Sequence, residues 1–337
     1  MKGITHFVSG VAIATFFPYV VEQGAAGGVL PVLGGIGGIL PDTLDFKFAR
    51  YFERYDDEVD PDPVHPDPQM IAERVAAAMR EAYETGKVRN IMLHTIRMGA
   101  DLWRQYSVRF DPPAGEIIVR IGPLVNTGQV PLAGSEPENA EACVQVGVPM
   151  VHTYDAENKV DIFSGPSFAF ERQGDAVHVH FLDWHRRWSH SLPLAALGGL
   201  LVGLIVGLLG GWTLGLYGGL CFGLGFAGHV LEDQLGHMGS NLFWPFTRKR
   251  IPGLRLLRSG DAIPNFLTVW TALALILLNL DRFSEKPLLP LIPYLLVALG
   301  LPWLVLGGMY VRQRLQRKPE PEEKLKQAEM VAEAEEL

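Results

Sequence analysis

The sequence contains little cysteine and no concentrated patch of positive charge. Cys143 and Cys221 are the only cysteines among 337 residues, and such a pair makes no disulfide framework of a small secreted domain. The basic residues are not interleaved with aromatic residues, so we predict no nucleic-acid partner. The first residues include no basic segment and no clear cleavage site, so we expect no cleavable secretory signal there.

The hydrophobic residues are unevenly distributed along the chain. They make up 48% of it, yet the mean hydropathy is only +0.15, because long apolar stretches alternate with charged segments. This alternation is typical of an integral membrane protein. The apolar stretches form three pairs: 7–22 with 25–40, 192–209 with 211–228, and 264–280 with 287–309. We therefore predict an all-α polytopic membrane bundle of about six hydrophobic helices in three hairpins. Because Pro18 and Pro31 interrupt the first pair, it either spans fully or forms a re-entrant hairpin.

A soluble α+β insert is predicted between the first and second pairs. It opens with an acidic linker at 56–63, which lacks the glycine and terminal glutamate of a calcium-binding EF-hand loop. Apolar residues at helical spacing predict a helix from 68 to about 105, and β-forming residues predict strands beginning at 116, 159, 167 and 176. The predicted domains are a first membrane hairpin at 1–50, the insert at 51–182, a second membrane domain at 183–310 and a charged tail at 311–337.

Three hairpins would place both termini, the insert and the loop at 229–263 on one side of the membrane. The short segments on that side carry twelve Lys and Arg residues, whereas the opposite side carries only Arg282 and Lys286. The long insert is left out of this comparison, because the positive-inside bias acts through short segments. We predict a protein of the inner (cytoplasmic) membrane with the insert and both termini in the cytoplasm.

Histidines and carboxylates gather at four boundaries of the apolar stretches, all on this same side. His6 precedes the first stretch, Asp42 and Asp45 follow the second, His185 and His190 precede the third, and His229 and Asp233 end the fourth. Imidazole and carboxylate groups are ligands of zinc, manganese and iron. His229 and Asp233 are four residues apart, so a helix presents both on one face. We predict that one or two divalent ions are bound here, with zinc favoured over manganese. The predicted ligands are His6, Asp42, His185, His190, His229 and Asp233.

The same cluster predicts roles in hydrolysis. Metal ions would lower the pKa of a water molecule and clamp a phosphoester, with Asp45 or Glu232 as the general base. Arg186 or Arg187 would bind the anionic phosphate. Metal binding requires neutral histidines, so we expect the affinity to fall as the pH drops through the imidazole range. Five other histidines are predicted to face solvent or to pack within the fold: His65, His94, His152, His178 and His180. His237 lies one helical turn beyond Asp233 and drifts away from the face of His229, so it ranks below the six as a ligand.

These residues follow the motif order of a known family. His6, Leu40-Pro41-Asp42, His185-Arg186-Arg187-Trp188-Ser189-His190-Ser191, His229 with Asp233, and Trp244-Pro245-Phe246 resemble the YdjM-type membrane-bound metal-dependent hydrolases over about 1–50 and 183–310. The resemblance implies an integral-membrane metal-dependent hydrolase, with a more distant similarity to zinc-dependent phospholipase C and P1-type nucleases. The family's Pro-Asp-x-Asp reads Pro41-Asp42-Thr43-Leu44-Asp45 here, so the second carboxylate is displaced by one residue.

We interpret the protein as a metal-dependent phosphoesterase that acts on a lipid, a lipid-linked compound or another phosphoester. A membrane transporter or metal carrier is the first alternative, which would favour ionisable residues deep within the spans, where the six stretches carry almost none. A membrane-anchored scaffold whose insert binds a protein partner is the second alternative, and the polar cluster would then be unnecessary.

The predicted orientation is tested by reporter fusions placed after residue 140 and at the C-terminus. Because both positions should lie in the cytoplasm, a reporter that is active only in the cytosol should be active in both fusions. Two inactive fusions would reverse the orientation, and opposite results would contradict the even number of membrane crossings between the two positions.

Overall fold

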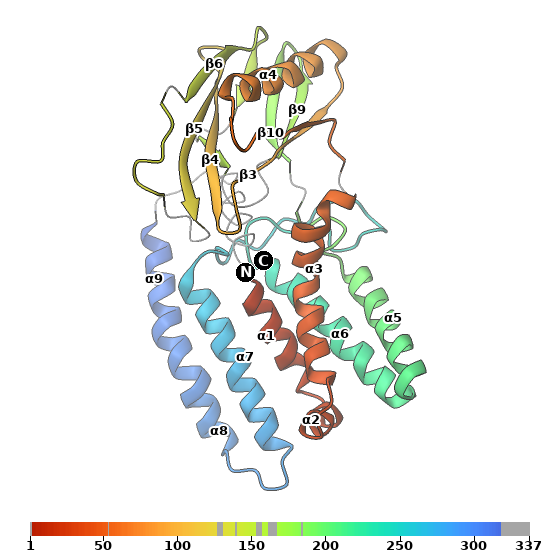
Figure 1. The fold of residues 1–337 in the computed structure, drawn as a ribbon. Helices are drawn as coiled ribbons and strands as arrows, with labels where there is room; N and C mark the ends of the chain where they lie inside the picture. Colours follow the sequence, from red (N-terminus) through yellow and green to blue (C-terminus); the bar gives the residue numbers. More distant parts are fainter. Residues whose placement is uncertain are drawn as a thin grey trace. The chain divides into compact units, whose positions relative to one another are not determined.

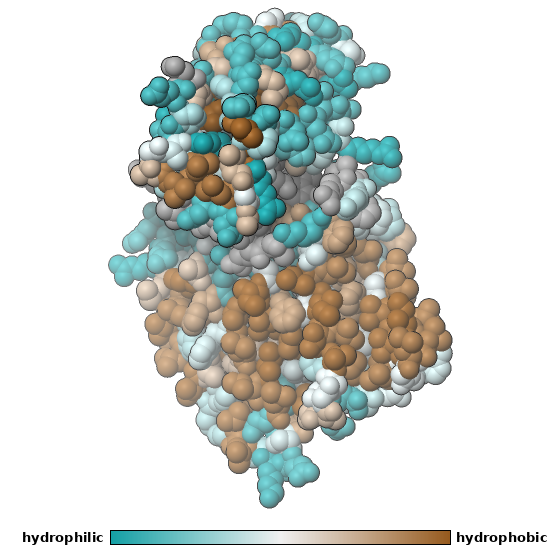
Figure 2. Space-filling model, viewed as in Figure 1, coloured by the Kyte–Doolittle hydropathy of each residue, from teal (hydrophilic) through white to brown (hydrophobic). Residues whose placement is uncertain are grey.

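The computed structural model describes residues 2–52, 54–126, 131–138, 140–152, 157–160, 167–182 and 185–317. The chain divides into two compact units, one formed by Met1–Ala49 with His185–Leu337 and the other by Arg50–Trp184. We call the first the membrane unit and the second the insert. Figure 2 shows apolar side chains covering the helices of the membrane unit.

The membrane unit is built from helices (Figure 1). They are α1 (Gly3–Ala14), α2 (Pro18–Ala25), α3 (Leu30–Phe52), α5 (Leu192–Gly210), α6 (Trp212–Asp233), α7 (Ala262–Arg282), α8 (Leu291–Tyr294) and α9 (Gly308–Gln316). Two π-helical segments, Leu295–Gly300 and Trp303–Gly307, join α8 to α9 in one continuous helix. Gly211, whose φ of 96° lies in the region that favours glycine, forms the tight turn between α5 and α6.

Within the described residues, four helices are long and apolar enough to cross a membrane: Leu192–Gly210, Trp212–Asp233, Ala262–Arg282 and Leu291–Gln316. The bent pair of α1 and α2, with an angle of 104° at its break, could add a fifth span. The prediction of an all-α bundle with six hydrophobic helices is therefore wrong. Pro18 begins a new helix instead of continuing α1, and α3 extends past residue 40 to include Asp42, Asp45 and Lys47. The insert also contributes strands in two sheets, so the fold is not all-α.

Glycines bring α1, α3 and α6 into direct backbone contact. A Cβ atom on Gly10 of α1 would lie against the carbonyl oxygen of Gly34 in α3, and one on Gly225 of α6 would meet the same oxygen. A Cβ on Gly37 would lie against the carbonyl oxygen of Phe222. Small residues allow such close approach between membrane helices. The three helices are therefore close enough for short side chains at their polar ends to meet.

Two buried hydrogen bonds hold α1 against α7. The Thr5 hydroxyl donates to Asn265 Oδ1 over 3.1 Å near one end of α1, and Asn279 Nδ2 donates to Thr15 Oγ1 over 3.1 Å near the other end. In an apolar environment such bonds between helices are typical contacts of packed spans. Together with the glycine contacts to α3, they fix the position of α1, which carries His6.

The insert contains one helix, α4 (Pro68–Thr85), and two sheets. The strands are β1 (Asp57–Val59), β2 (Arg89–Leu93), β3 (Ile96–Arg97), β4 (Leu102–Asp111), β5 (Glu116–Asn126), β6 (Glu141–Gln145), β7 (Met150–His152), β8 (Asn158–Val160), β9 (Ser167–Gln173) and β10 (Ala176–Phe181). One sheet has the order β1-β2-β9-β10-β7, and the other has the order β3-β4-β5-β6 with β8 paired to β4. The β1–β2 and β7–β10 pairs are parallel, and the other pairs are antiparallel.

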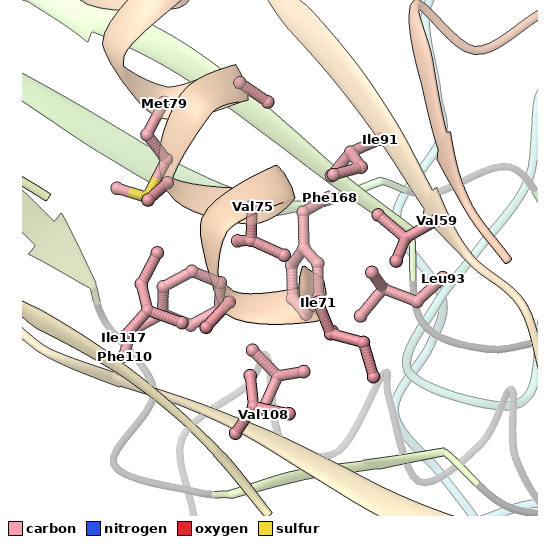
Figure 3. Packing of buried hydrophobic residues seen from close by; sticks show 14 of the residues in the cluster. Val59, Ile71, Val75, Met79, Ile91, Leu93, Val108, Phe110, Ile117 and Phe168 are labelled. Atoms are coloured by element: carbon pink, nitrogen blue, oxygen red, sulfur yellow. The ribbon is translucent and has the colours of Figure 1, made fainter. Parts of the chain in front are cut away.

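The core of the insert lies between α4 and the strands. Figure 3 shows Ile71 and Val75 of α4 beside Phe168 of β9 and Leu93 of β2, all fully buried. The predicted strands beginning at 116, 167 and 176 are confirmed. The helix predicted from 68 to about 105 is wrong beyond Thr85, because Gly86 ends α4 in the left-handed conformation (φ 66°) and strands follow.

The insert should fold without the membrane unit. A fragment of residues 54–182 should be soluble and give a circular dichroism spectrum of mixed helix and strand, because its core is complete. A fragment of residues 66–182 lacks β1, whose Val59 is buried against the core, so its free energy of unfolding should be lower by at least about 1.5 kcal/mol. Urea titration of both fragments measures this difference. A disordered spectrum of the longer fragment would contradict independent folding.

Candidate metal centre

The polar residues of four segments meet at one end of the membrane unit. His6 comes from α1, Asp42 and Asp45 from α3, His185, Arg186, Ser189 and His190 from the turn before α5, and His229, Glu232 and Asp233 from α6. The structure brings together all six residues that were predicted as metal ligands. Each of the six is at most 1% exposed, so they form a buried polar cluster rather than a solvated surface.

Four donor atoms form the centre of the cluster. The Nε2 atoms of His190 and His229 are 3.1 Å apart, and each lies 3.2–3.3 Å from Asp42 Oδ1 and 3.2 Å from Asp233 Oδ2. A tetrahedron whose corners lie about 2.0 Å from its centre has edges of about 3.3 Å, which is the ligand spacing of four-coordinate zinc. Five of the six edges are therefore close to the length that a tetrahedral ion requires. The chemistry of the donor set fits zinc as well, since two nitrogens and two carboxylate oxygens are accepted ligands.

His6 and His185 extend this donor set through different carboxylates. His6 Nε2 lies 3.2 Å from Asp233 Oδ1, and His185 Nε2 lies 3.9 Å from Asp42 Oδ1. Among the described residues, neither His6 Nε2 nor Asp42 Oδ2 has a hydrogen-bond partner, although both atoms are buried. Buried polar atoms normally find partners, and those that do not require an explanation such as an ion. Both atoms therefore remain available for a metal.

The other ring nitrogen of each histidine is held by an outer acceptor. His229 Nδ1 donates to the carbonyl oxygen of Gly38 over 2.6 Å, which leaves its Nε2 with a lone pair. His6 Nδ1 lies 2.8 Å from Glu232 Oε2, and His185 Nδ1 lies 2.8 Å from Asp45 Oδ2. Metal-binding histidines characteristically use this arrangement, because the outer bond fixes both the tautomer and the ring orientation.

His190 contacts three carboxylates, those of Asp42 and Asp233 through Nε2 and that of Asp45 through Nδ1. Its Nε2 belongs to the four-atom centre, while its Nδ1 is 2.9 Å from Ser189 Oγ and 3.3 Å from Asp45 Oδ2. Asp45, His185 and His190 form a second group that is compact enough to hold an ion. The 2.8 Å contact between Asp45 and His185 has the length of a hydrogen bond. Asp45 also accepts a hydrogen bond from the backbone N–H of Arg186 over 2.8 Å, so its geometry favours an orienting role.

Leaving the histidines aside, the buried side chains of the cluster carry more negative than positive charge. Asp42, Asp45 and Asp233 are buried carboxylates, whereas Arg186 contributes one buried positive charge. Burial by itself lowers the pKa of His190, but its hydrogen bonds to Asp233, Asp42 and Asp45 outweigh that effect and raise the pKa well above the usual value. The cluster thus favours additional positive charge at its centre, from protons or from a divalent cation.

The four predicted catalytic residues have different surroundings. Arg186 is fully buried with a positive φ of 59°, and its guanidinium donates to the Asp233 carbonyl oxygen over 3.0 Å and lies 3.2 Å from Asp233 Oδ1. Arg187 is exposed. Glu232, with a side chain 19% exposed, is the more accessible of the two predicted bases, since Asp45 is only 4% exposed. Two groups that orient histidines were not predicted from the sequence: the Ser189 hydroxyl, beside His190, and the Gly38 carbonyl oxygen, which binds His229. A backbone carbonyl can belong to any residue type, so the sequence gives no indication of it.

The remaining histidines lie outside the two metal-compatible groups. His94 lies 2.9 Å from Glu58 and His180 lies 3.5 Å from Glu171, both in the insert. His237 follows α6 and belongs to neither group.

Residues 158–310 match the family model described as the YdjM inner membrane protein. The YdjM resemblance found in the sequence motifs is thereby confirmed for a part that includes His185, His190, His229 and Asp233. The YdjM match agrees with the apolar helices in assigning a membrane protein. No curated protein and no solved structure matches the chain.

Replacing His229 or Asp233 with Ala should lower the zinc content of the purified protein, because each removes one donor from the four-atom centre. His237→Ala is the matched control, since it removes a histidine eight residues away from His229 without changing either group. Metal analysis by mass spectrometry, with membrane insertion checked for each variant, measures the effect. Full zinc occupancy in both His229→Ala and Asp233→Ala would show that the assigned ligands are wrong.

Replacing Asp45 with Asn should weaken zinc binding about 10- to 100-fold without changing the number of ions bound. The reason is that Asp45 orients His185 and Arg186 through hydrogen bonds instead of binding the ion directly. A zinc titration against a competing chelator gives both the affinity and the stoichiometry. Loss of one bound ion, with the remaining ion held at full affinity, would instead make Asp45 a ligand of a second metal.

Proposed function

We propose that this protein is an integral-membrane metal-dependent hydrolase that cleaves a phosphoester. One observation carries the proposal: four buried histidines hold Nδ1 on outer acceptors and turn Nε2 toward Asp42 or Asp233. A set of hydrogen bonds formed only for stability would not require all four rings to share this orientation. The family match supports a membrane protein, and the matched residues 158–310 include His185, His190, His229 and Asp233.

The donor set favours a catalytic over a purely structural metal. Structural zinc sites are closed and rich in cysteine, whereas Cys221, the cysteine of the membrane unit, is in neither metal-compatible group. Six buried donors exceed the four that one structural ion needs. The surplus suits either two ions or one ion with a coordination position that substrate can reach.

Each residue of the cluster then has a role. His190, His229, Asp42 and Asp233 would hold the ion, with His6 and His185 as further ligands. A bound divalent ion supplies Lewis acidity, which favours deprotonation of water and stabilises charge on a phosphoester. Arg186 compensates the charge of Asp233. Glu232 connects His6 to the exposed edge of the cluster and is the better placed of the two predicted bases to pass a proton to solvent. The exposed Arg187 is available to an anionic substrate.

The proposal is tested with zinc-loaded protein and a panel of bis(p-nitrophenyl) phosphate, p-nitrophenyl phosphate and phosphatidic acid. Asp42→Ala removes a proposed metal ligand. Loss of a residue that only orients a ligand lowers activity about 10- to 100-fold, so Asp42→Ala should lower kcat by more than about 100-fold. Asp175→Ala, a substitution of an exposed aspartate in the insert, is the control and should leave activity unchanged. Activity that survives both chelation and Asp42→Ala would contradict a metal-dependent hydrolysis at this cluster.

A metal carrier is the alternative that the same panel addresses. It would bind zinc through the same residues but cleave none of the three compounds. Wild-type protein with stoichiometric zinc and no phosphoesterase activity would therefore favour the carrier.

A further inference from the structure

An apolar groove runs along α5 and α6 in the membrane unit. Its volume is about 690 Å³, and all of its lining residues are apolar or glycine. Glycines at positions such as Gly203 and Gly219 allow the two helix backbones to touch, and larger side chains such as Leu200 and Leu216 flank the contact. Because glycines at the helix contact have no side chains and the leucines beside it are large, the surface between the two rows of leucines is concave.

The groove opens toward the surroundings of the helices. Only 17% of the apolar window of α5 is buried, and Leu200 and Leu216 are 73% and 60% exposed. Since α5 and α6 are candidate spans, the groove would open into the hydrocarbon region of a bilayer. The lining of α5 extends from Leu192 to Leu204, which corresponds to about 18 Å of helix. Half of a bilayer hydrocarbon core is about 15 Å thick, so the groove has the length of a lipid chain from one leaflet.

One end of the groove adjoins the metal centre. Leu192 lines the groove and directly follows His190 and Ser191, and Ala227 lines it two residues before His229. The polar cluster and the end of the apolar groove therefore lie on neighbouring turns of the same segments. A molecule with a hydrocarbon chain in the groove would have its polar end at the level of the metal centre.

The segment that follows α6 is hydrogen-bonded to this end of the groove and carries basic and aromatic residues. The Leu192 N–H donates to the Leu242 carbonyl oxygen over 2.9 Å, which ties the segment after α6 to the start of α5. That segment carries the exposed Phe246, Arg248 and Lys249. Exposed aromatic residues near the ends of spans are typical of the membrane interface, and Lys and Arg there attract anionic lipid headgroups.

We propose that the α5–α6 groove binds the hydrocarbon chain of an anionic phosphoester lipid, whose headgroup lies between Arg248, Lys249 and the metal centre. This inference rests on the proposed function and names the class of its substrate. In the hydrolysis, the oxygen of water bonds to phosphorus while the ester P–O bond breaks. The leaving oxygen takes up one proton of the water, and the other proton stays on the new P–OH group of the phosphate product. The apolar groove selects for a long chain, and the basic residues select for negative charge.

The binding step is tested by photolabelling, independently of activity. Full-length protein is placed in phosphatidylcholine vesicles that contain phosphatidic acid with a diazirine in its acyl chain. Label should concentrate on peptides from 192–204 and 215–227 and should be sparse on Leu291–Gln316, a helix whose hydropathy lies between those of α5 and α6 but which does not line the groove. Equal labelling of both regions in the wild type would overturn the proposal without any variant.

Substitutions in the groove sharpen the test. Ala196→Trp fills the groove near its polar end and should reduce labelling of the groove peptides about tenfold, provided that zinc content is unchanged. Leu197→Trp is the matched control, because Leu197 is exposed on the same helix but does not line the groove. Arg248→Glu combined with Lys249→Glu should reduce labelling by phosphatidic acid but not by a neutral phosphatidylcholine probe. Unchanged labelling in Ala196→Trp would overturn the groove as the binding site.

The results also separate this inference from the hydrolase itself. If His229→Ala loses hydrolysis of phosphatidic acid but keeps the labelling pattern, both proposals are supported. If the wild type is labelled in the groove and cleaves no phosphoester, the hydrolase fails and the lipid site stands. If Ala196→Trp cleaves phosphatidic acid as fast as the wild type, the groove proposal fails while the hydrolase stands.

Discussion

The burial of three carboxylates at one end of the membrane unit is the constraint on which the rest of that unit depends. Removing an ionised carboxylate from water costs several kcal/mol unless positive charge and hydrogen bonds compensate it. Asp42, Asp45 and Asp233 receive this compensation from a buried arginine, from the backbone N–H of Arg186 and from four imidazole rings. All four rings turn Nε2 toward Asp42 or Asp233. The negative charge that remains uncompensated therefore lies at the four-atom centre, where the spacing of the donor atoms suits a divalent ion.

The helix packing makes this concentration possible. Glycines let α1, α3 and α6 approach until their backbones touch, so His6, Asp42 and His229 reach one another with ordinary side-chain lengths. The close contact also positions the Gly38 carbonyl oxygen to fix the ring of His229. The tight turn before α5, with Arg186 at a positive φ, brings His185 and His190 in from the remaining side. The polar cluster therefore depends on the glycines at the helix contacts.

The sequence was sufficient to place the cluster but not to assign the roles within it. Spacing along one helix placed His229 beside Asp233, and recurrence of polar residues at span boundaries pointed to a common layer. The displaced second carboxylate of the Pro-Asp motif still reaches the cluster, because Asp42 and Asp45 are three residues apart on α3 and share a helix face. The partners of each ring nitrogen depend on tertiary packing, so no pattern could show that Asp45 and Glu232 hold histidines. Hydropathy alone also misjudged the first pair, where Pro18 breaks one helix and charged residues lie within α3.

We propose that the buried histidines and aspartates bind a metal ion, which X-ray absorption at the zinc edge of the purified protein can detect. We expect a nearest shell of nitrogen and oxygen atoms at about 2.0–2.1 Å from zinc, with outer-shell scattering from imidazole rings. If the wild-type protein held no more zinc than a double variant with Asp42→Ala and His190→Ala, these residues would not be zinc ligands. A nearest shell containing sulfur at about 2.3 Å would contradict the proposal as well.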